Sequence, residues 1–507
     1  MKEKLRESIK DYRFWAVAIC AVMIAVFLPF NFTNIAIPTP TDYGAASCAF
    51  IYLAIALPII VIAIVAGIKL KKSKTLLLVC GLLTLSLIIR LLFANDVSGD
   101  YDFFLSAWVD EYRSLSVKEC FIKQVGNYPP LYNYFLIAFS RMDISDMYLI
   151  KILSYCGEIV TAIFAVKIIA YVRKQSFNFV IFAIFLILPV PIINGIQWAQ
   201  CDTLYTMCAV AGVYFALRSK SIPCFIFIGL GLAFKMQMLF ILPAGLVILL
   251  AKKPEGGKYL LWRFIWIVPL VFLFASSLPV CFGGSFFKVF KVYFEQATVG
   301  NTYLGQVLNG HCANILLPFS QVGNGSALYY ICLVLFILIT AVVEIFIIVH
   351  TLKSTNRILD TEKLIFLCFT LPFVSVFFMP KMLDRFFYIA EIFGSIYFFI
   401  KRDKISFTAS VLLETGQVLV YLQTVCYKYI GGIIVITPLF TGFALILIAA
   451  RFFKYFPCKK PKFLPVWVDA IEYGKVIKPA AEETQEPNDE PANESADDQP
   501  AQQNENQ

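Results

Sequence analysis

The sequence predicts an all-α polytopic membrane protein, and three observations lead to that fold class. Hydrophobic residues make up 59% of the 507 residues and charged residues only 15%, against roughly 25% charged residues in soluble domains. The mean hydropathy is +0.76. Apolar runs of about 17–25 residues recur along the chain, and each is long enough to cross a bilayer as a helix.

These runs predict about fourteen spanning segments. They lie at residues 12–30, 47–69, 75–94, 148–171, 177–193, 200–217, 223–234, 236–251, 262–281, 326–352, 363–379, 386–400, 406–423 and 431–450. The first follows a basic leader with no convincing cleavage site after it, so we expect a retained anchor. The short runs 223–234 and 236–251 form either one broken helix or a pair. The run 131–140 is too short to span, and we expect a half-helix there.

The basic residues predict the orientation. The net charge of +9 is carried by short basic clusters between the spans, which is the positive-inside pattern and argues against nucleic acid as a partner. These clusters fall on the side of the N-terminus, so both termini are expected in the cytoplasm. Two long loops, about 95–147 and 282–325, and two short turns, 194–199 and 380–385, are then outside.

The chain divides into three expected regions. Residues 1–74 form an N-terminal extra transmembrane hairpin, residues 75–450 form the transmembrane core, and residues 451–507 form a cytoplasmic tail that is first basic and then acidic. From about residue 480 the tail is acidic and rich in Pro, Gln and Asn. Such a segment cannot bury a core and is expected to be disordered.

Polar residues interrupt the apolar segments mainly on the outer side of this topology. Charge near lipid is costly, so these residues are candidates for a functional site. The candidates are Asp100, Asp102, Tyr128, Gln197, Gln200, Asp202, Lys235, Gln237, His311, Lys381, Asp384 and Arg385. Because they come from separate stretches but share one side, the sequence predicts a reaction site at one membrane surface.

Asp100 and Asp102 open the first long loop in the segment SGDYDFFLSAW. Two carboxylates just beyond a span can provide a general base or coordinate a divalent cation. A solvated loop with a capping Asp is the structural alternative. The 14 cysteines include no CxxC pair and lie mostly in apolar runs, so they indicate neither a zinc site nor a disulfide framework.

Two further outer segments carry hydrogen-bonding side chains. Tyr128 lies in GNYPPLYNYF, where the aromatic residues suit either the membrane interface or a substrate contact. Gln197, Gln200 and Asp202 lie in QWAQCDTLYT, at the mouth of two apolar segments. They can bind sugar hydroxyls, or they can act as a helix cap and as polar contacts between helices.

Cationic side chains complete the set. Lys235 and Gln237 interrupt a long apolar stretch in GLAFKMQ. A lysine at this boundary can bind a lipid-linked phosphate, or it can simply extend its ammonium to the interface.

The turn PKMLDRFFY holds Lys381, Asp384 and Arg385. Arg385 can bind a phosphate in a bidentate way, or it can pair with Asp384 within the turn. His311 lies in the second long loop and is one of only two histidines. A lone histidine of this kind is more often structural than catalytic.

The ordered series SGDYDFFLSAW, GNYPPLYNYF, QWAQCDTLYT, GLAFKMQ and PKMLDRFFY resembles the GPI-mannosyltransferase-like family of the GT-C glycosyltransferase superfamily. The resemblance covers roughly residues 90–400. In relatives the last motif resembles PKMHERYFY, so Leu383 and Asp384 replace a His-Glu pair here. The spans before residue 75 and the acidic tail are additions to the family pattern.

The resemblance implies a GT-C-type helical bundle whose outer loops carry short helices. It implies transfer of a hexose, mannose first of all, from a polyprenyl-phosphate donor to an extracytoplasmic glycan, lipid or protein acceptor, with inversion. Asp100 is then the candidate base and Asp102 its neighbour. No cofactor is required, although the Asp-x-Asp pair permits a divalent cation.

The expected location is the membrane, most simply a bacterial plasma membrane with the site on its outer face. Two other function classes stay open. A transporter or flippase of lipid-linked sugars also carries intramembrane charge and broken helices. A polysaccharide polymerase or ligase would use the same lipid-phosphate donor.

Overall fold

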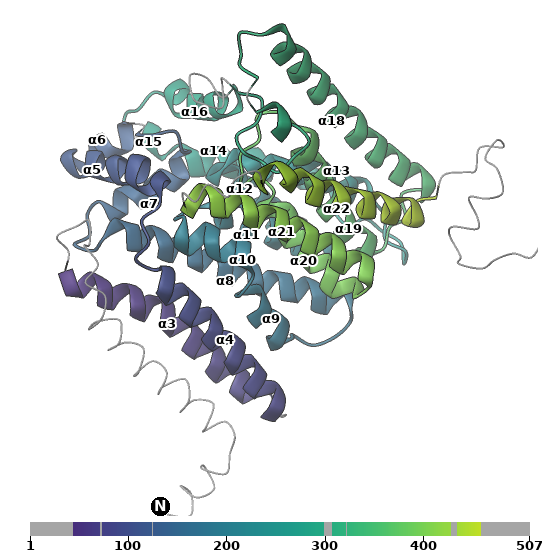
Figure 1. Cartoon of the computed structure of the whole chain (residues 1–507), viewed down its shortest axis with the longest axis horizontal. Helices are drawn as coiled ribbons and strands as arrows, with labels where there is room; N and C mark the ends of the chain where they lie inside the picture. Colours follow the sequence, from purple (N-terminus) through teal and green to yellow (C-terminus); the bar gives the residue numbers. More distant parts are fainter. Residues whose placement is uncertain are drawn as a thin grey trace, which may run out of the picture. The chain divides into compact units, whose positions relative to one another are not determined.

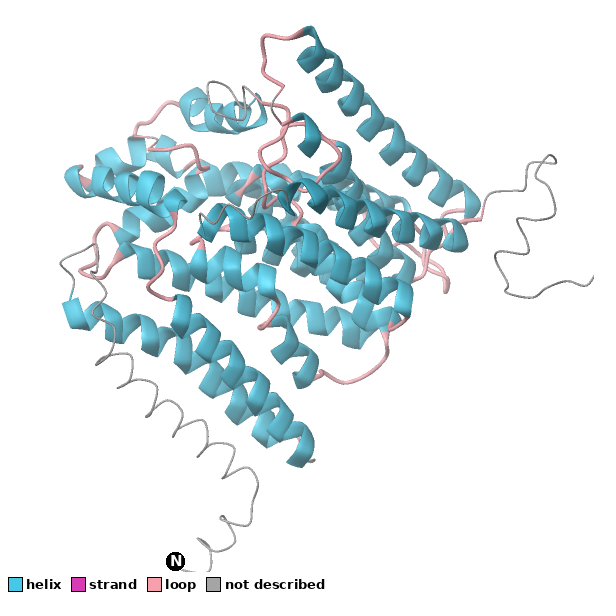
Figure 2. Ribbon diagram, viewed as in Figure 1, coloured by secondary structure: helices cyan, strands magenta, loops and turns pink. Residues whose placement is uncertain are grey.

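The computed structural model describes residues 44–70, 73–123, 125–298, 307–320, 322–426 and 433–457. In this part of the chain the regular structure is helical, with isolated bridges and no named strand (Figure 2). The expected all-α polytopic membrane fold is confirmed. The predicted anchor at 12–30 and the predicted disordered tail from about residue 480 lie outside the described residues.

Seven of the described helices are long and apolar enough to cross a membrane. They are α3 (Gly44–Lys69), α4 (Ser73–Phe93), α8 (Asp146–Val172), α18 (Ala327–Ser354), α19 (Thr361–Phe378), α21 (Lys404–Cys426) and α22 (Ile433–Tyr455). The pairs α3–α4 and α21–α22 lie side by side (Figure 1). Most of α19 is buried in protein, whereas α18 exposes most of its apolar surface, as expected of a helix at the lipid boundary.

The predicted span at 177–193 is instead a bent pair. α9 (Phe179–Phe185) is followed by α10 (Pro189–Ile192) and the π-helical turn η2 (Ile193–Gln197), with a bend of 52° at the break. Two prolines at the start of α10 cannot donate backbone hydrogen bonds to the preceding turn, so the helix breaks there. A periodicity argument sees only the continuous apolar composition and misses the break.

The remaining predicted spans are shorter helices. They are α11 (Asp202–Leu217), α12 (Ser221–Phe234), η3 (Met236–Ile241) continued by α13 (Leu242–Leu250), η4 (Trp262–Phe264), α14 (Ile267–Ser276), α15 (Leu278–Cys281) and α20 (Tyr388–Lys401). α12 and η3 are separated at Lys235, whose backbone is extended (φ −163°, ψ 142°). The segments 223–234 and 236–251 are therefore a pair of helices.

The two long loops carry short helices at one end of the bundle. The first loop contains the π-helical turn η1 (Tyr101–Leu105), α5 (Ser106–Ser114), α6 (Val117–Ile122) and α7 (Pro130–Phe139). The second contains α16 (Phe286–Thr298) and η5 (Leu317–Phe319). α7 begins at a proline and has ten residues, so the expected half-helix is present.

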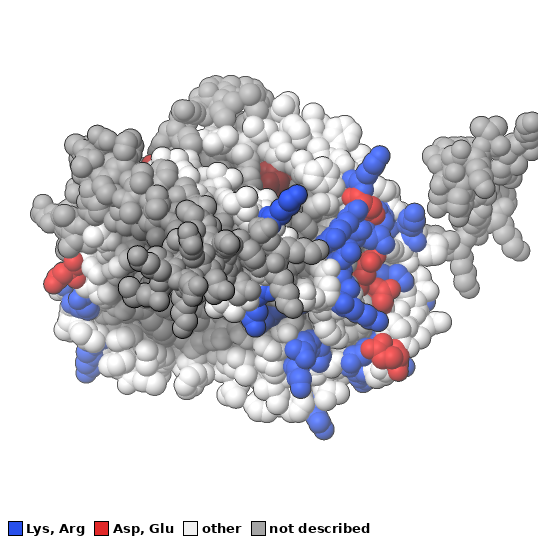
Figure 3. Space-filling view, turned by 90° about the horizontal axis from the view of Figure 1, so that it is seen from below, with Lys and Arg blue, Asp and Glu red and all other residues white. Residues whose placement is uncertain are grey.

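The basic connections meet at the other end of the bundle. The backbone N–H of Lys252 donates to the carbonyl of Arg357 at 2.7 Å, and Arg173 Nη1 donates to the carbonyl of Ile400 at 2.7 Å. Many of the visible Lys and Arg side chains gather towards the right-hand end in Figure 3. The described part thus separates a basic end from the end that holds the two long loops, as the charge pattern predicts.

A buried ion pair supports the bent helix. Arg90 on α4 pairs with Glu158 on α8, and its Nη1 donates to the carbonyl of Leu186 at 2.6 Å. Leu186 is the residue at which α9 ends, so its carbonyl has lost its helical partner. Ser86 Oγ donates to the same carbonyl at 3.0 Å. These contacts hold the segment that leads into the candidate site.

Candidate functional site

The ends of a helix hairpin create the first contact of the site. α11 and α12 pack together and are joined by a short connection, so the start of α11 and the end of α12 lie at the same level. Asp202 begins α11 and Lys235 follows α12, and Lys235 Nζ donates to Asp202 Oδ1 at 2.5 Å. Both side chains are buried. An acid at a helix N-terminus and a cation at a helix C-terminus also suit the two helix dipoles.

Arg385 joins this pair from the turn between α19 and α20. Its Nε lies 3.7 Å from Asp202 Oδ2, and its Nη1 lies 3.3 Å from Asp100 Oδ2 and 3.7 Å from Asp384 Oδ1. The guanidinium also lies over the ring of Trp198, 5.1 Å from its centroid. Burial lowers the pKa of Arg385, but the surrounding carboxylates outweigh that effect and raise the pKa above its ordinary value. The guanidinium is therefore a fixed positive charge.

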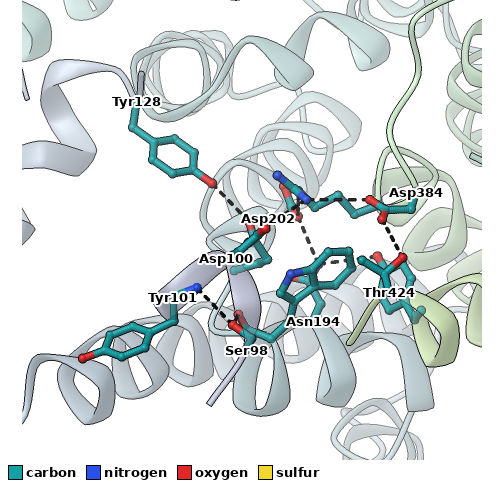
Figure 4. A network of polar contacts seen from close by, with 12 residues as sticks. Ser98, Asp100, Tyr101, Tyr128, Asn194, Asp202, Asp384 and Thr424 are labelled. Atoms are coloured by element: carbon teal, nitrogen blue, oxygen red, sulfur yellow. Dashed lines mark hydrogen bonds and ion pairs between the residues drawn. The ribbon is translucent and has the colours of Figure 1, made fainter. Parts of the chain in front are cut away.

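Asp100 is the most exposed carboxylate of the network. Its side chain is 32% exposed, against 0% for Asp202 and 5% for Asp384. Gln200 Nε2 donates to Asp100 Oδ2 at 2.6 Å, and the Tyr128 hydroxyl donates to Gln200 Oε1 at 3.1 Å. In Figure 4 the labelled Tyr128, Asp100 and Asp202 lie around one centre. Asp100 is thus held in place while part of it stays open to a ligand.

Asp384 is held on the opposite side of Arg385. Thr424 on α21 donates to Asp384 Oδ2 at 2.9 Å (Figure 4). Burial raises the pKa of Asp384 to about 6, although Arg385 and the Thr424 hydroxyl act against that rise, and the charges of Asp100 and Asp202 add to it. Asp384 lies in the turn between α19 and α20, outside the helices, so the protonation of its carboxyl group can respond to the pH at the site.

The second long loop pairs with the same turn. The N–H of Gly310 donates to the carbonyl of Met382 at 2.9 Å, and the N–H of Asp384 donates to the carbonyl of Gly310 at 3.1 Å. His311 follows with a left-handed backbone (φ 65°), and burial lowers the pKa of its imidazole. The pairing brings His311 next to Leu383 in the turn.

Lys381 points in a different direction from Arg385. Its ammonium lies over the ring of Tyr329, 5.7 Å from the centroid, at the start of α18. Its backbone is left-handed (φ 61°), and its N–H donates to the carbonyl of Leu308 at 2.6 Å. Of the two cations predicted on this turn, the structure therefore brings Arg385 to the carboxylates and directs Lys381 towards α18.

Asp102 is exposed and takes no part in the network. The segment around it is helical, with Asp100 itself in a right-handed helical conformation, and residues two apart on a helix do not face each other. The described residues contain no group of three or more His, Cys, Asp or Glu side chains that could hold a metal ion. The geometry thus gives no support to one cation shared by Asp100 and Asp102.

The two other predicted amides differ in their surroundings. Gln197 Nε2 donates to Asp96 Oδ2 at 3.3 Å, so it supports the start of the first long loop. Gln237 lies on η3 two residues after Lys235, and its buried Oε1 has no hydrogen-bond partner among the described residues. Gln197 is therefore engaged in the fold, whereas Gln237 has a buried acceptor that the described residues leave unsatisfied.

Several residues of the site were not among the twelve candidate residues. Asn194 Nδ2 donates to Asp202 Oδ2 at 3.0 Å, and Tyr421 packs edge-on against Trp198 at 5.1 Å. Tyr421 and Thr424 both come from α21, which the sequence shows as a simple apolar span. A signal was present, since Gln417, Tyr421 and Thr424 repeat at helical spacing on one face of that span.

The site lies at the end of short helices. α11 has 16 residues and is roughly 24 Å long at the standard helical rise, whereas a hydrocarbon core is about 30 Å thick. If these helices start at the basic boundary, their far ends stop a few ångströms short of the opposite boundary. The network therefore lies at the ends of α11 and α12 that are opposite their basic connection, Arg218–Lys220.

The network can bind an anion next to a proton acceptor. Lys235 and Arg385 supply two cations that are already positioned, and Asp100 supplies a partly open carboxylate within 3.3 Å of Arg385. Asp202 holds both cations and has no exposed surface of its own. Comparison with known proteins adds no assignment, because no protein-family model and no curated protein matches the chain.

Proposed function

We propose that this protein is a membrane glycosyltransferase that transfers a hexose, most simply mannose, from a polyprenyl-phosphate donor to an acceptor outside the cytoplasm. The observation that carries the proposal is the placement of a partly open carboxylate, Asp100, 3.3 Å from Arg385, which shares the buried Asp202 with a second cation, Lys235. A sugar-phosphate donor needs both groups, because its reaction releases a phosphate and a proton.

The reaction follows from these positions. Asp100 accepts the proton of the acceptor hydroxyl while the acceptor oxygen forms a bond to the anomeric carbon. The bond between that carbon and the phosphate oxygen breaks, and the polyprenyl phosphate leaves with the electron pair. Attack from the side opposite the leaving group inverts the anomeric centre. Arg385 and Lys235 stabilise the negative charge that develops on the phosphate.

The supporting residues have separate roles in this mechanism. Gln200 and Tyr128 orient Asp100 through consecutive hydrogen bonds of 2.6 and 3.1 Å. Asp202 and Trp198 fix the position of Arg385. Gln237, whose buried Oε1 has no hydrogen-bond partner among the described residues, is the candidate to bind a hydroxyl of the sugar or the acceptor. Each role concerns the orientation of a group, and orientation accounts for a large part of catalysis in general.

A transporter of lipid-linked sugars is the second candidate. The bent pair α9–α10 and the buried Arg90–Glu158 ion pair favour it, because broken helices and intramembrane charges are common in transporters. Transporter sites lie near the bilayer midplane. The Arg385 network lies at the ends of α11 and α12, away from their connection, and this position favours the enzyme over the transporter. A polymerase or ligase would use the same site with a larger acceptor.

A transfer assay with the purified protein tests the proposal. Protein reconstituted in vesicles is supplied with radiolabelled polyprenyl-phosphate mannose and a mixture of membrane glycolipids as acceptors. A labelled product whose formation requires the protein supports transfer. Movement of intact labelled donor between leaflets, with no new glycosidic bond, would instead establish the transporter.

A further inference from the structure

α16 has two unlike faces. Val289, Val292 and Tyr293 are buried against the rest of the protein. On the other side, Phe287 is 84% exposed, and Phe286 at the start of the helix is 48% exposed. Lys288 and Lys291 are also exposed. Residues three and four apart are neighbours on a helix, so the Lys291 side chain lies beside both Lys288 and the Phe287 ring.

The buried face fixes α16 close to the candidate site. The Tyr293 hydroxyl donates to the carbonyl of Ala233 at 3.1 Å and shares a hydrogen bond of 2.9 Å with Ser276. Ala233 lies two residues before Lys235, and α16 also packs on η3. Figure 1 shows α16 next to α15, which in turn contacts α6 of the first loop. α16 is therefore attached to the element that holds a cation of the site.

α16 does not span a membrane, although it follows a lipid-facing segment. Its 13 residues give a helix of roughly 20 Å, and its first turns carry two lysines. The apolar helix α14, which precedes α15 and α16 in the chain, exposes Leu270, Leu273 and Phe274, the last at 83%. Exposed apolar side chains therefore continue from a membrane helix to α16. Exposed phenyl rings next to lysines are typical of helices that lie in the interface plane.

We propose that the exposed face of α16 binds the head-group layer of the surrounding bilayer, at the end of the bundle that holds the Arg385 network. Phe286 and Phe287 enter the boundary of the acyl chains, and Lys288 and Lys291 contact the phosphates of anionic phospholipids. The positive lysines complement the negative phosphates, and the two apolar rings complement the boundary of the acyl chains. Because Tyr293 links α16 to Ala233, this contact sets the level of Lys235 relative to the lipid phosphates.

Photo-crosslinking in a defined bilayer tests this inference. A photo-reactive amino acid replaces Phe287 in the full-length protein, which is reconstituted in vesicles of phosphatidylcholine with phosphatidylglycerol. The matched control carries the same amino acid at Asp110, which is exposed on α5 at the same end of the bundle. We expect about 10-fold or more lipid adduct at 287 than at 110, the ratio that corresponds to placing one phenyl ring in an apolar layer.

The lysines are tested in the same preparation. Replacing Lys288 and Lys291 by Gln should lower the phosphatidylglycerol share of the adducts, by roughly 5-fold per lysine as is typical for a basic residue at an anionic surface. Equal lipid adducts at 287 and 110, or adducts from 287 to a second copy or to the chain itself, would overturn the proposal. The readout does not depend on sugar transfer, so it stands or fails separately from the proposed enzyme.

Discussion

Removing the charge of Asp202 is the most informative perturbation of the site, because two cations depend on it. Asp202→Asn keeps the shape of the side chain, and the new amide oxygen can still accept the hydrogen bond from Asn194. It leaves Lys235 and Arg385, which lie 2.5 and 3.7 Å from the carboxylate oxygens, without their shared anion. We expect a loss of stability and, if the proposed function holds, a loss of transfer.

The magnitude follows from the distances. With an effective dielectric constant of about 20, the attraction is about 7 kcal/mol for Lys235 at 2.5 Å and about 4 kcal/mol for Arg385 at 3.7 Å. The desolvation of three buried charges offsets most of this attraction. Removal of one partner of a buried ion pair typically costs about 3–5 kcal/mol. For a compact unit of 457 residues, that cost corresponds to a fall of about 3–5 °C in the unfolding midpoint.

Thermal unfolding of the purified protein in detergent measures this effect. Asp102→Asn is the matched control, because Asp102 is exposed on the same loop as Asp100 and takes no part in the network. Its midpoint should stay within about 0.5 °C of the wild-type value, as is usual for a surface substitution. If Asp202→Asn unfolds at the wild-type temperature, the buried charge network does not stabilise this end of the bundle, and the reasoning fails.

Three further predictions concern single buried groups. Lys151 Nζ donates to the carbonyls of Phe93, Ala94 and Asp96 at 3.2, 2.8 and 2.6 Å. Lys151→Met should therefore lower the free energy of unfolding by about 3 kcal/mol, whereas the control Lys167→Met, on the exposed face of α8, should not. Equal unfolding midpoints of the two variants would contradict this prediction. Glu391 is buried, and neither of its carboxylate oxygens has a partner among the described residues. Glu391→Leu should therefore leave the free energy of unfolding unchanged or raise it, whereas Glu158→Leu should lower it by about 3–5 kcal/mol because Arg90 is left unpaired. The pKa of Asp384 is raised to about 6 in the folded state, so the stability that its protonated form contributes is present at low pH and is lost as the pH rises through 6. Asp384→Asn should remove this fall in stability between about pH 4 and pH 6.5. If the unfolding midpoint of the variant keeps the pH profile of the wild type, the raised pKa of Asp384 is refuted.

The helical fold and the two ends of the bundle could be predicted because both depend on local composition. Apolar runs fix the helices, and the basic clusters fix which connections share an end. The contact between Asp202 and Lys235 could also have been predicted from the sequence. α11 and α12 are a hairpin of similar lengths, so the residue that begins one helix meets the residue that follows the other.

The parts that could not be predicted depend on backbone geometry and on distant pairing. Asp100 was expected as the base, with Asp102 as a neighbour that could share a divalent cation with it, but the helical turn directs the two side chains to different sides. Lys381 was expected beside Arg385, but the pairing of the turn with Leu308 and Gly310 directs it towards Tyr329. No local pattern in the sequence predicts the backbone bridge between Gly310 and Leu383, which lie some seventy residues apart.

The polar residues of α21 were overlooked for a different reason. Tyr421 and Thr424 lie in a segment whose mean composition is apolar, and a span predicted by composition hides such a face. In the structure this face supplies the Thr424 contact to Asp384 and the Tyr421 contact to Trp198. A search for polar residues at helical spacing inside each span would have added both.

The proposed base is the central claim, and the transfer rate of Asp100→Asn tests it most directly. The substitution keeps the size of the side chain and leaves Gln200 and Arg385 in place, but it removes the proton acceptor. With labelled polyprenyl-phosphate mannose, the rate should fall by about 10²–10⁴-fold, while donor binding and the unfolding midpoint change little. Asp102→Asn should transfer at the wild-type rate. Normal transfer by Asp100→Asn, or a loss that appears only in Asp102→Asn, would contradict the mechanism.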